Sequence, residues 1–383
     1  MSDGLFATSE PNAWVDVDCA ALQANATLLR RQFSRPEIIA VVKADGYGHG
    51  AVQSALAFRR AGVGRFAVTS LDEASTLTAG GIAATETPIL VFAPVVTSAQ
   101  AAELCRIGAQ ATVCDAHHVR LLIQAAEGAG TKIGVHVKVD TGMSRLGEMP
   151  SDALGIVRLV AASDRLTIAG VYTHFARASE KDLAPTRAQC AKFKAFIEQL
   201  SDQGIKPGLC HAANSAAAMR LPEAHFDAVR LGTILYGQYP SVHVPRIDGL
   251  NGRTWSAKAR VVFVRRLQAG ALVGYGSEAR ISRPSRVAVI AVGYADGFGM
   301  SPDSLHRGKR GVAALARQLA GRENQHVLIH GHRAPVLGRV AMQMIVVDVT
   351  GIPIAVEDGD IAEIPMRRLA ASPRLPRVYH GKP

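Results

Sequence analysis

Eight short apolar runs, separated by longer segments of helical spacing, limit the fold of this sequence more than any other feature. They lie between Trp14 and about Arg230 and have the length and β-branched content of buried strands. The runs are Ile38–Val42, Phe66–Ser70, Pro88–Ala93, Ala111–Asp115, Ile133–Val139, Leu166–His174, Leu209–Asn214 and Ala228–Gly232. The intervening segments, such as Thr186–Gln203, are rich in Ala, Leu and Gln. Eight successive strand–helix units predict a parallel (β/α)8 barrel rather than an open sheet.

The sequence changes character after Pro240. Short apolar runs now follow one another across Gly and Pro turns, almost without helical segments, which is typical of an antiparallel sheet. These runs are Val261–Arg266, Arg286–Val292, Val327–His330, Ile345–Val349 and Asp360–Ile364. The exception is Ser301–Gln325, a basic segment of helical spacing that we interpret as solvated surface. We therefore expect a barrel over residues 13–245 and a mainly antiparallel β domain over residues 246–383.

Length, charge and cysteine content narrow the class of protein. A chain of 383 residues is long for one hydrophobic core, which agrees with two domains. The net charge of +11 would suit nucleic acid or a small anion, but the basic residues are dispersed and aromatic residues make up only 5%. We expect no nucleic-acid partner and, since no apolar run is long enough, no membrane span. Five scattered cysteines and the lack of a signal peptide predict a reduced, cytoplasmic protein.

Lys43 stands where an apolar strand gives way to a glycine-rich turn, in AVVKADGYGHG. Catalytic groups of parallel α/β barrels gather at the carboxyl ends of strands, and an amine held there can act as a base or form an imine. The glycines of this turn allow backbone to approach a ligand closely, and Tyr47 offers a hydroxyl. A strand-end lysine can equally extend to water, so this stretch alone decides nothing.

Polar residues end five of the eight predicted strands. They are Lys43, Asp140, His174, Asn214 and Arg230. Because the carboxyl ends of parallel strands meet at one rim, we expect these side chains to lie together. Lys138 lies on the same strand face as Asp140, and a buried lysine needs a partner or a chemical modification. His174 could instead be a hydrogen-bonded core histidine, and Arg230 a structural ion-pair partner.

Two further stretches predict a phosphate site. HAANSAA places Ser215 ahead of a helical segment, and RLGTILYG places Gly232 beside Thr233, so amides and hydroxyls suited to phosphate occur in both. GYGSEAR places Tyr275 between two glycines, where a tyrosine usually only packs. An amine, phosphate ligands and cations around them are the groups that a pyridoxal 5'-phosphate enzyme needs.

Eight motifs of the chain resemble, in order and along nearly its whole length, those of the alanine racemase family of barrel-type pyridoxal phosphate enzymes. They are VVKADGYGHG, KVDTGMSRLG, THFA, HAANSAA, RLGTILYG, GYGSEAR, VGYADGF and GRVAMQM. The resemblance implies a cytoplasmic isomerase that interconverts L- and D-alanine for peptidoglycan. It also implies a homodimer with active sites at the subunit interface, and a β domain that includes residues 1–12.

The resemblance further implies two bases on opposite faces of the substrate. Lys43 would bind the cofactor and be one base, and Tyr275 of the partner subunit would be the other. The phosphate would be held by Tyr47, Ser215, Gly232 and Thr233.

The surroundings of the cofactor ring follow from the same resemblance. Arg145 would meet the phenolic oxygen, His174 would lie against the ring, and Arg230 would face the pyridine nitrogen. Because arginine only donates hydrogen bonds, that nitrogen would stay unprotonated and the cofactor would be a weaker electron sink. Arg145 and the backbone at Met342 would contact the substrate, while Lys138 matches a position that is carbamylated in many members. No metal is expected.

The chain departs from the family pattern near the expected pocket entrance. Gln343 stands where an acidic residue is usual, and Ser179 stands where an aspartate is common. The carboxyl-terminal portion is shortened and lacks the family's pocket tyrosine, for which Tyr239 and Tyr379 are candidate substitutes. These differences leave the amino-acid specificity open.

Three alternatives to an alanine racemase remain, and the first follows from these departures. The first is a racemase of another or broader set of amino acids, for example serine. A related decarboxylase is disfavoured because its pattern has a catalytic cysteine in the β domain, and no cysteine follows Cys210. A non-catalytic pyridoxal phosphate-binding protein would resemble the barrel alone, so the domain after Pro240 argues against it.

Overall fold

The computed structural model describes residues 10–300 and 325–381, so the basic segment Ser301–Gln325, except for its last residue, lies outside the described residues. The chain divides into two compact units. One is Cys19–Thr254 together with Gly381, and the other comprises residues up to Asp18 and Trp255–His380. The ranges expected from sequence were 13–245 and 246–383 with 1–12. The first unit begins at Cys19 instead of residue 13, because Ala13–Asp18 pairs with a strand of the second unit. The long carboxyl-terminal segment of the second unit begins at Trp255 instead of residue 246.

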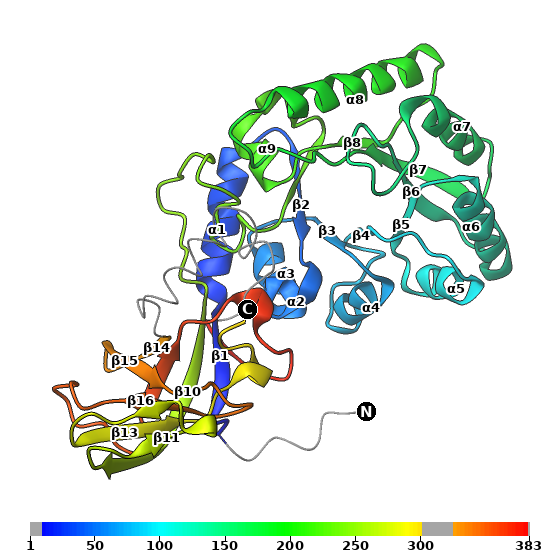
Figure 1. The fold of residues 1–383 in the computed structure, drawn as a ribbon. Coiled ribbons are helices and arrows are strands. Elements are labelled where there is room, and N and C mark those ends of the chain that lie inside the picture. Colours follow the sequence, from blue (N-terminus) through cyan, green and yellow to red (C-terminus); the bar gives the residue numbers. More distant parts are fainter. Residues whose placement is uncertain (1–9, 301–324, 382–383) are drawn as a thin grey trace. The chain divides into compact units, whose positions relative to one another are not determined.

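The first unit, called the barrel unit below, is a closed barrel of eight parallel strands (Figure 1). The strands are β2 (Glu37–Val41), β3 (Arg65–Val68), β4 (Ile89–Val91), β5 (Gln110–Val113), β6 (Ile133–Lys138), β7 (Leu166–Tyr172), β8 (Leu209–His211) and β9 (Ala228–Leu231). Each pairs with its neighbour in sequence, and β9 closes the ring against β2. All eight expected runs form these strands, so the predicted (β/α)8 architecture is confirmed.

Helices surround the barrel because their apolar residues recur on one face. They are α1 (Cys19–Gln32), α3 (Ala51–Arg60), α4 (Leu71–Ala79), α5 (Ser98–Ile107), α6 (Ala116–Ala129), α7 (Pro150–Ala161), α8 (Ala184–Asp202) and α9 (Ser215–Arg220), with a short turn α2 (Lys43–Tyr47) and a 3-10 turn η1 (Pro222–Ala224). In α6 the buried residues include Val119, Leu122 and Ala126, which share a face at helical spacing. Helices on one side of each strand and packed side chains on the other bury both strand faces, which explains the unbroken apolar runs.

Side-chain caps fix where several of these helices begin. Ser70, Thr97, Asp115 and Asn214 each accept a hydrogen bond from the backbone amide three residues later. These bonds satisfy amides that have no partner within a helix. These four caps therefore also fix where the preceding strand-to-helix loops end. Those loops form part of the rim of the barrel.

The second unit, called the β unit below, is built around the long strand β10 (Trp255–Leu267). Its other strands are β1 (Ala13–Asp18), β11 (Leu272–Val273), β12 (Ala279–Arg280), β13 (Ser285–Ile290), β14 (His326–Ile329), β15 (His332–Leu337), β16 (Ile345–Asp348), β17 (Ile361–Ile364) and β18 (Arg377–His380), with 3-10 turns η2 (Tyr275–Ser277), η3 (Tyr294–Asp296) and η5 (Arg368–Ala370). The main sheet has the order β13-β16-β15-β14-β17-β10-β1-β18, with β13 also pairing with β10. All pairings in it are antiparallel except β1 with β18, which confirms a mainly antiparallel domain.

The core of the β unit is formed by alternating strand residues such as Ala257, Ala259 and Val261 of β10. The five runs expected from sequence are strands, whereas β15 and β18 were not expected. Within the described residues, the amino-terminal strand is Ala13–Asp18, which follows the first dozen residues expected from sequence.

None of the described helices combines the length and hydrophobicity that crossing a bilayer requires. The five cysteines are unpaired, as expected, and all except Cys105 are buried. Burial raises the pKa of the Cys114 thiol to about 11 and that of Cys210 to about 12, so these thiols are unreactive at neutral pH.

Candidate active site

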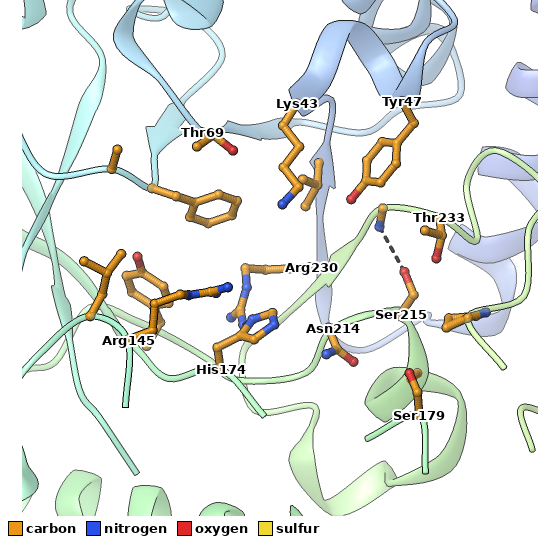
Figure 2. Close-up of a pocket in the computed structure, with 18 of the residues that line it drawn as sticks. Lys43, Tyr47, Thr69, Arg145, His174, Ser179, Asn214, Ser215, Arg230 and Thr233 are labelled. Carbon is orange, nitrogen blue, oxygen red and sulfur yellow. Dashed lines mark hydrogen bonds between the residues drawn. The ribbon is translucent and has the colours of Figure 1, made fainter. Parts of the chain in front are cut away.

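A cavity of about 480 Å3 lies within the barrel unit, among the carboxyl ends of its strands (Figure 2). It brings together the barrel residues that sequence analysis assigned to the site. These are Lys43, Tyr47, Lys138, Arg145, His174, Ser215, Arg230, Gly232 and Thr233. The expectation that the polar strand ends meet at one rim is therefore met for Lys43, His174, Asn214 and Arg230, all of which line the cavity.

Lys43 enters the cavity from the end of β2, directly ahead of an unusual backbone turn. Ala44, Asp45 and Gly46 have φ of 51°, 51° and 61°, and Tyr47 has φ of 52°, so α2 is a left-handed turn. The left-handed region costs about 1–2 kcal/mol for each residue that carries a Cβ. The turn places Lys43 at its start and Tyr47 at its end, and both side chains line the cavity.

Three hydroxyl groups gather on one side of the cavity, those of Tyr47, Ser215 and Thr233 (Figure 2). The Gly232 amide donates to the Ser215 hydroxyl at 3.0 Å, which joins the ends of β8 and β9. A Cβ on Gly232 would collide with the Tyr47 hydroxyl oxygen, so only glycine lets this wall close so tightly. Hydroxyls and a backbone amide in so small a space are suited to bind a phosphate group.

Gly232→Ala is expected to weaken binding of pyridoxal phosphate by at least about tenfold, because the added methyl group displaces the Tyr47 hydroxyl from the cradle. Titration of the cofactor-free protein measures this directly. Gly128→Ala is a matched control, since nothing lies near its added Cβ within α6. An unchanged affinity for Gly232→Ala would contradict the assignment of this wall to phosphate.

Arg230 forms the floor of the cavity and is 3% exposed. Its guanidinium donates to the carbonyl oxygens of Thr173 at 2.7 Å, Ala212 at 2.8 Å and His211 at 3.0 Å, and it has no carboxylate partner among the described residues. Burial lowers its pKa to about 10, which still leaves it protonated at neutral pH. Carbonyl dipoles hold this cation in place, so the described residues give no support to the alternative of a structural ion-pair partner.

A chain of hydrogen bonds behind Arg230 fixes the tautomers of two buried histidines. Gln110 Oε1 lies 2.9 Å from His136 Nε2, His136 Nδ1 lies 3.0 Å from His211 Nε2, and His211 Nδ1 lies 2.8 Å from Arg230. Since the guanidinium only donates, His211 Nδ1 must accept, its Nε2 must carry the proton, and His136 is protonated at Nε2 in turn. Burial lowers the pKa of His136 to about 3 and that of His211 well below its usual value, so both rings are neutral.

Gly170 makes this chain of imidazoles possible. His136 lies on β6 and His211 on β8, with β7 between them. A Cβ on Gly170 would lie 2.6 Å from His136 Nδ1, so the absence of a side chain there lets the two rings meet across β7.

His174 is held by Arg230, whose Nη2 lies 3.2 Å from His174 Nδ1. Burial, together with the charges of Arg230, Lys138, Arg145 and Lys43, lowers the pKa of His174 to about 2. The ring is therefore neutral, accepts from Arg230 at Nδ1, and carries its proton on Nε2. The core-histidine alternative is not supported, because His174 lines the cavity.

Lys138 is 4% exposed, and its Nζ has no hydrogen-bond partner within the described residues. The carboxylate of Asp140, two residues along the chain, instead accepts hydrogen bonds from the backbone amides of Gly142, Met143 and Ser144. These bonds outweigh burial, which alone would raise the pKa of Asp140, and hold it below its usual value. For Lys138, burial and the charge of Arg230 lower the pKa to about 7. Its Nζ lies 4.7 Å from the centroid of the Tyr172 ring, a favourable contact for a cation.

Tyr275 and Met342 belong to the β unit and are not among the residues that line the barrel cavity. Their side chains are 73% and 58% exposed, so each is accessible within its own unit.

Ser179 lines the cavity, whereas Tyr239 does not. The hydroxyl of Tyr239 instead accepts from the Ile247 amide at 2.7 Å. Tyr379 lies in β18 of the β unit.

Sequence analysis missed several residues that shape the cavity. Tyr172, Phe92 and Thr69 line it, while His136 and His211 act behind it. His136 was detectable in principle, because it precedes Lys138 by two residues and so shares its strand face. In the described residues no group of three or more His, Cys, Asp or Glu side chains could hold a metal ion.

Comparison with known proteins agrees with this geometry. Residues 17–240 match the family profile described as the alanine racemase N-terminal domain, and residues 254–372 match that of the alanine racemase C-terminal domain. The chain belongs to the alanine racemase family.

Named proteins and solved structures that are similar to this chain are alanine racemases. The chain is 35% identical over 388 residues to an alanine racemase of Desulforamulus reducens, covering 96% of this chain and 99% of the relative. It is 37% identical over 391 residues to one from Symbiobacterium thermophilum, covering 96% and 97%. Among solved structures, alanine racemases of Clostridium difficile 630 and of Streptomyces lavendulae match with TM-scores of 0.85 and 0.82 at 27% and 29% identity. These matches cover 97% of this chain in both cases, and 97% and 98% of the respective structures.

Proposed function

We propose that this protein interconverts L- and D-alanine with pyridoxal 5'-phosphate as its cofactor. One observation carries the proposal: a single cavity holds the Lys43 amine, a cradle of hydroxyls and a backbone amide, and the buried cation Arg230. Family membership supports the same reaction. The product D-alanine would serve peptidoglycan synthesis, and we infer a cytoplasmic enzyme.

The residues present fit the proposed cofactor. Tyr47, Ser215, Thr233 and the Gly232 amide would hold the phosphate, and Lys43 lies beside them to bind the aldehyde carbon. When bound, the cofactor withdraws electrons from the substrate α-carbon and so acidifies its proton. Arg230 would stand opposite the pyridine nitrogen and, being a donor only, would keep that nitrogen unprotonated.

The remaining cavity residues would orient the substrate and the ring. Arg145 lines the cavity on the side opposite the hydroxyl cradle (Figure 2), where it would meet the phenolic oxygen and the substrate carboxylate. His174 would lie against the ring and donate from Nε2. Because burial and the charges of Arg230 and Arg145 lower its pKa, His174 stays neutral and does not compete for the proton that Lys43 would move.

Racemisation requires a second base on the far face of the substrate, and we propose Tyr275 of the partner subunit. Several large apolar side chains of the β unit are exposed, which supports a homodimer. They are Leu272, Tyr275, Tyr294, Met342 and Met344, each at least 48% exposed. Backbone bonds join the turn at Tyr294 to the segment of Met342, since Tyr294 and Ala295 donate to the carbonyls of Ala341 and Met342. Burial of such side chains against a second subunit would be favourable, and the backbone at Met342 would then help hold the substrate carboxylate.

Lys138 is proposed to be carbamylated. A pKa of about 7 makes the neutral amine, which is the form that reacts with carbon dioxide, abundant at pH 7–8. The resulting anion would be surrounded by Arg230 and Arg145, the same charges that lower the pKa of Lys138. Carbamylation would thus turn an unfavourable buried cation into a paired anion.

Added bicarbonate is expected to stabilise the protein at pH 8, and Lys138→Met is expected to abolish that effect. Without carbon dioxide, the free lysine binds a proton in the unfolded chain, but not in the folded one, between pH 7 and 10.5. Its contribution to stability therefore falls as pH drops through that window, and below it the folded state bears the full cost of the buried charge. Denaturant unfolding across pH measures this, and a carbamate resonance after labelling with 13C-bicarbonate tests the modification itself. No resonance and no effect of bicarbonate would refute it.

Racemisation of a broader set of amino acids is the second candidate, favoured by Ser179, a small residue in the cavity wall. Chiral chromatography after incubation with a panel of L-amino acids decides between the two. Turnover of L-alanine well above that of L-serine and longer substrates supports an alanine racemase. Faster turnover of another amino acid would instead establish the second candidate, and no racemisation by cofactor-loaded protein would refute both.

A further inference from the structure

We propose that Glu73 is a positioning residue that locks Lys43 at the cavity wall by clamping two loops of the barrel rim. Glu73 lies in the first turn of α4 and does not line the cavity itself. Its carboxylate reaches the left-handed turn that begins at Lys43. The inference rests on the proposed role of Lys43 as the cofactor-bound residue.

The carboxylate of Glu73 uses both of its oxygens. Oε1 accepts the amide of Ala44, the residue next to Lys43, at 2.6 Å. Oε2 accepts the amides of Thr69 at 2.7 Å and Ser70 at 3.2 Å, in the loop that follows β3. Lys43 and Thr69 both line the cavity, so one side chain ties together two neighbouring segments of its wall.

The left-handed turn needs such a clamp because its own backbone conformation is unfavourable. Ala44 has φ of 51° although it carries a Cβ and has no polar side chain to stabilise that conformation. Within the turn, amides from Gly46 onward donate to preceding carbonyls, beginning with Gly46 to Val42 at 2.9 Å. The Ala44 amide comes too early in the turn for such a bond and donates to Glu73 instead. Asp45 secures the other end by accepting the Ala51 amide at 2.9 Å.

An ordinary helix cap does not explain this arrangement. Ser70 and Glu73 form a capping box, in which the Ser70 hydroxyl accepts the Glu73 amide at 3.3 Å and Glu73 accepts the Ser70 amide. A capping box needs one acceptor oxygen at this position and works with glutamate or glutamine. In this protein the second oxygen of Glu73 accepts the Ala44 amide. In a glutamine at position 73 an NH2 group would replace that oxygen, so two hydrogen-bond donors would face each other. The requirement for two acceptors distinguishes a clamp from a cap.

Two variants separate these roles. Glu73→Gln keeps an acceptor for the capping box and removes the acceptor for Ala44, whereas Ser70→Ala weakens the cap and leaves both oxygens of Glu73 in place. The first readout is amide hydrogen exchange of the segment 43–50 in cofactor-free protein. We expect exchange there to be at least about tenfold faster in Glu73→Gln than in the wild type and unchanged in Ser70→Ala.

The second readout is the visible absorbance of the lysine-bound cofactor and its titration with added pyridoxal phosphate. Glu73→Gln is expected to weaken cofactor binding and to lower kcat more than it raises KM, with a thermal unfolding temperature close to that of Ser70→Ala. Wild-type exchange rates in segment 43–50 of Glu73→Gln would overturn the clamp, as would equal acceleration in Ser70→Ala. Because exchange is measured without cofactor, it decides the clamp even if wild-type protein binds no pyridoxal phosphate, a result that would refute the proposed function instead.

Discussion

Lys43→Ala is expected to lower racemisation by more than about 10⁴-fold and to remove the visible absorbance band of the lysine-bound cofactor. The large effect has two causes. The substitution removes the proposed covalent attachment of the cofactor, and it removes one of the two proposed bases. Absorbance spectra of protein purified with excess cofactor measure the first loss, and chiral analysis of alanine measures the second.

The phosphate cradle is separate from Lys43, so the Lys43→Ala protein should still bind pyridoxal phosphate weakly and be displaced by inorganic phosphate. Lys132→Ala is the matched control, since this exposed lysine lies on the opposite end of β6 from the cavity. Retention of the wild-type spectrum by Lys43→Ala would assign the cofactor to another amine and would contradict the account of the cavity.

Tyr275→Phe is expected to keep the wild-type absorbance and to lower racemisation by about 10²–10⁴-fold, because it removes the proposed second acid–base group without changing the residues of the cofactor cradle. The two-base arrangement gives a sharper expectation than loss of rate. Lys43 still serves one face of the substrate, so one enantiomer of alanine should exchange its α-proton with solvent deuterium while the other does not. Exchange followed by mass spectrometry for each enantiomer separately makes the measurement.

Equal α-proton exchange from both enantiomers in Tyr275→Phe would mean that another group serves the second face. Normal racemisation would remove Tyr275 from the mechanism altogether. Since this side chain is 73% exposed within its own unit, phenylalanine should leave the stability of the β unit unchanged, and a lower unfolding temperature would show that the substitution acts through folding.

The barrel could be predicted from sequence because the burial of its strands determines which residues they contain. A parallel strand buried on both faces must be apolar throughout, so each strand appears as a short run, and polar residues such as Lys43 and Arg230 mark the rim where the runs end. In the β unit, β15 was missed because Pro335 and the basic residues of HRAPVL interrupt the apolar alternation that identifies a strand.

The parts of the site that sequence did not predict depend on contacts between distant segments. Nothing local indicates that Ala44 adopts a left-handed conformation, because the Glu73 carboxylate that accepts its amide lies 29 residues away. The contact between His136 and His211 requires Gly170 on the strand between them, and register across three strands is a tertiary property. The sequence also does not show that Lys138 Nζ has no hydrogen-bond partner among the described residues, since Asp140 stands close in sequence yet accepts from backbone amides.

The central claim, that each active site combines Lys43 of one subunit with Tyr275 of its partner, is tested most directly by mixed dimers. Lys43→Ala and Tyr275→Phe subunits carrying different tags are co-expressed, and dimers bearing both tags are isolated. Such a dimer has one intact site and one doubly defective site, so it should regain about half of the wild-type activity although each parent is inactive. A dimer of wild-type and doubly substituted subunits should instead be nearly inactive, because each site then lacks one base. Activity in the second dimer and none in the first would contradict the shared site.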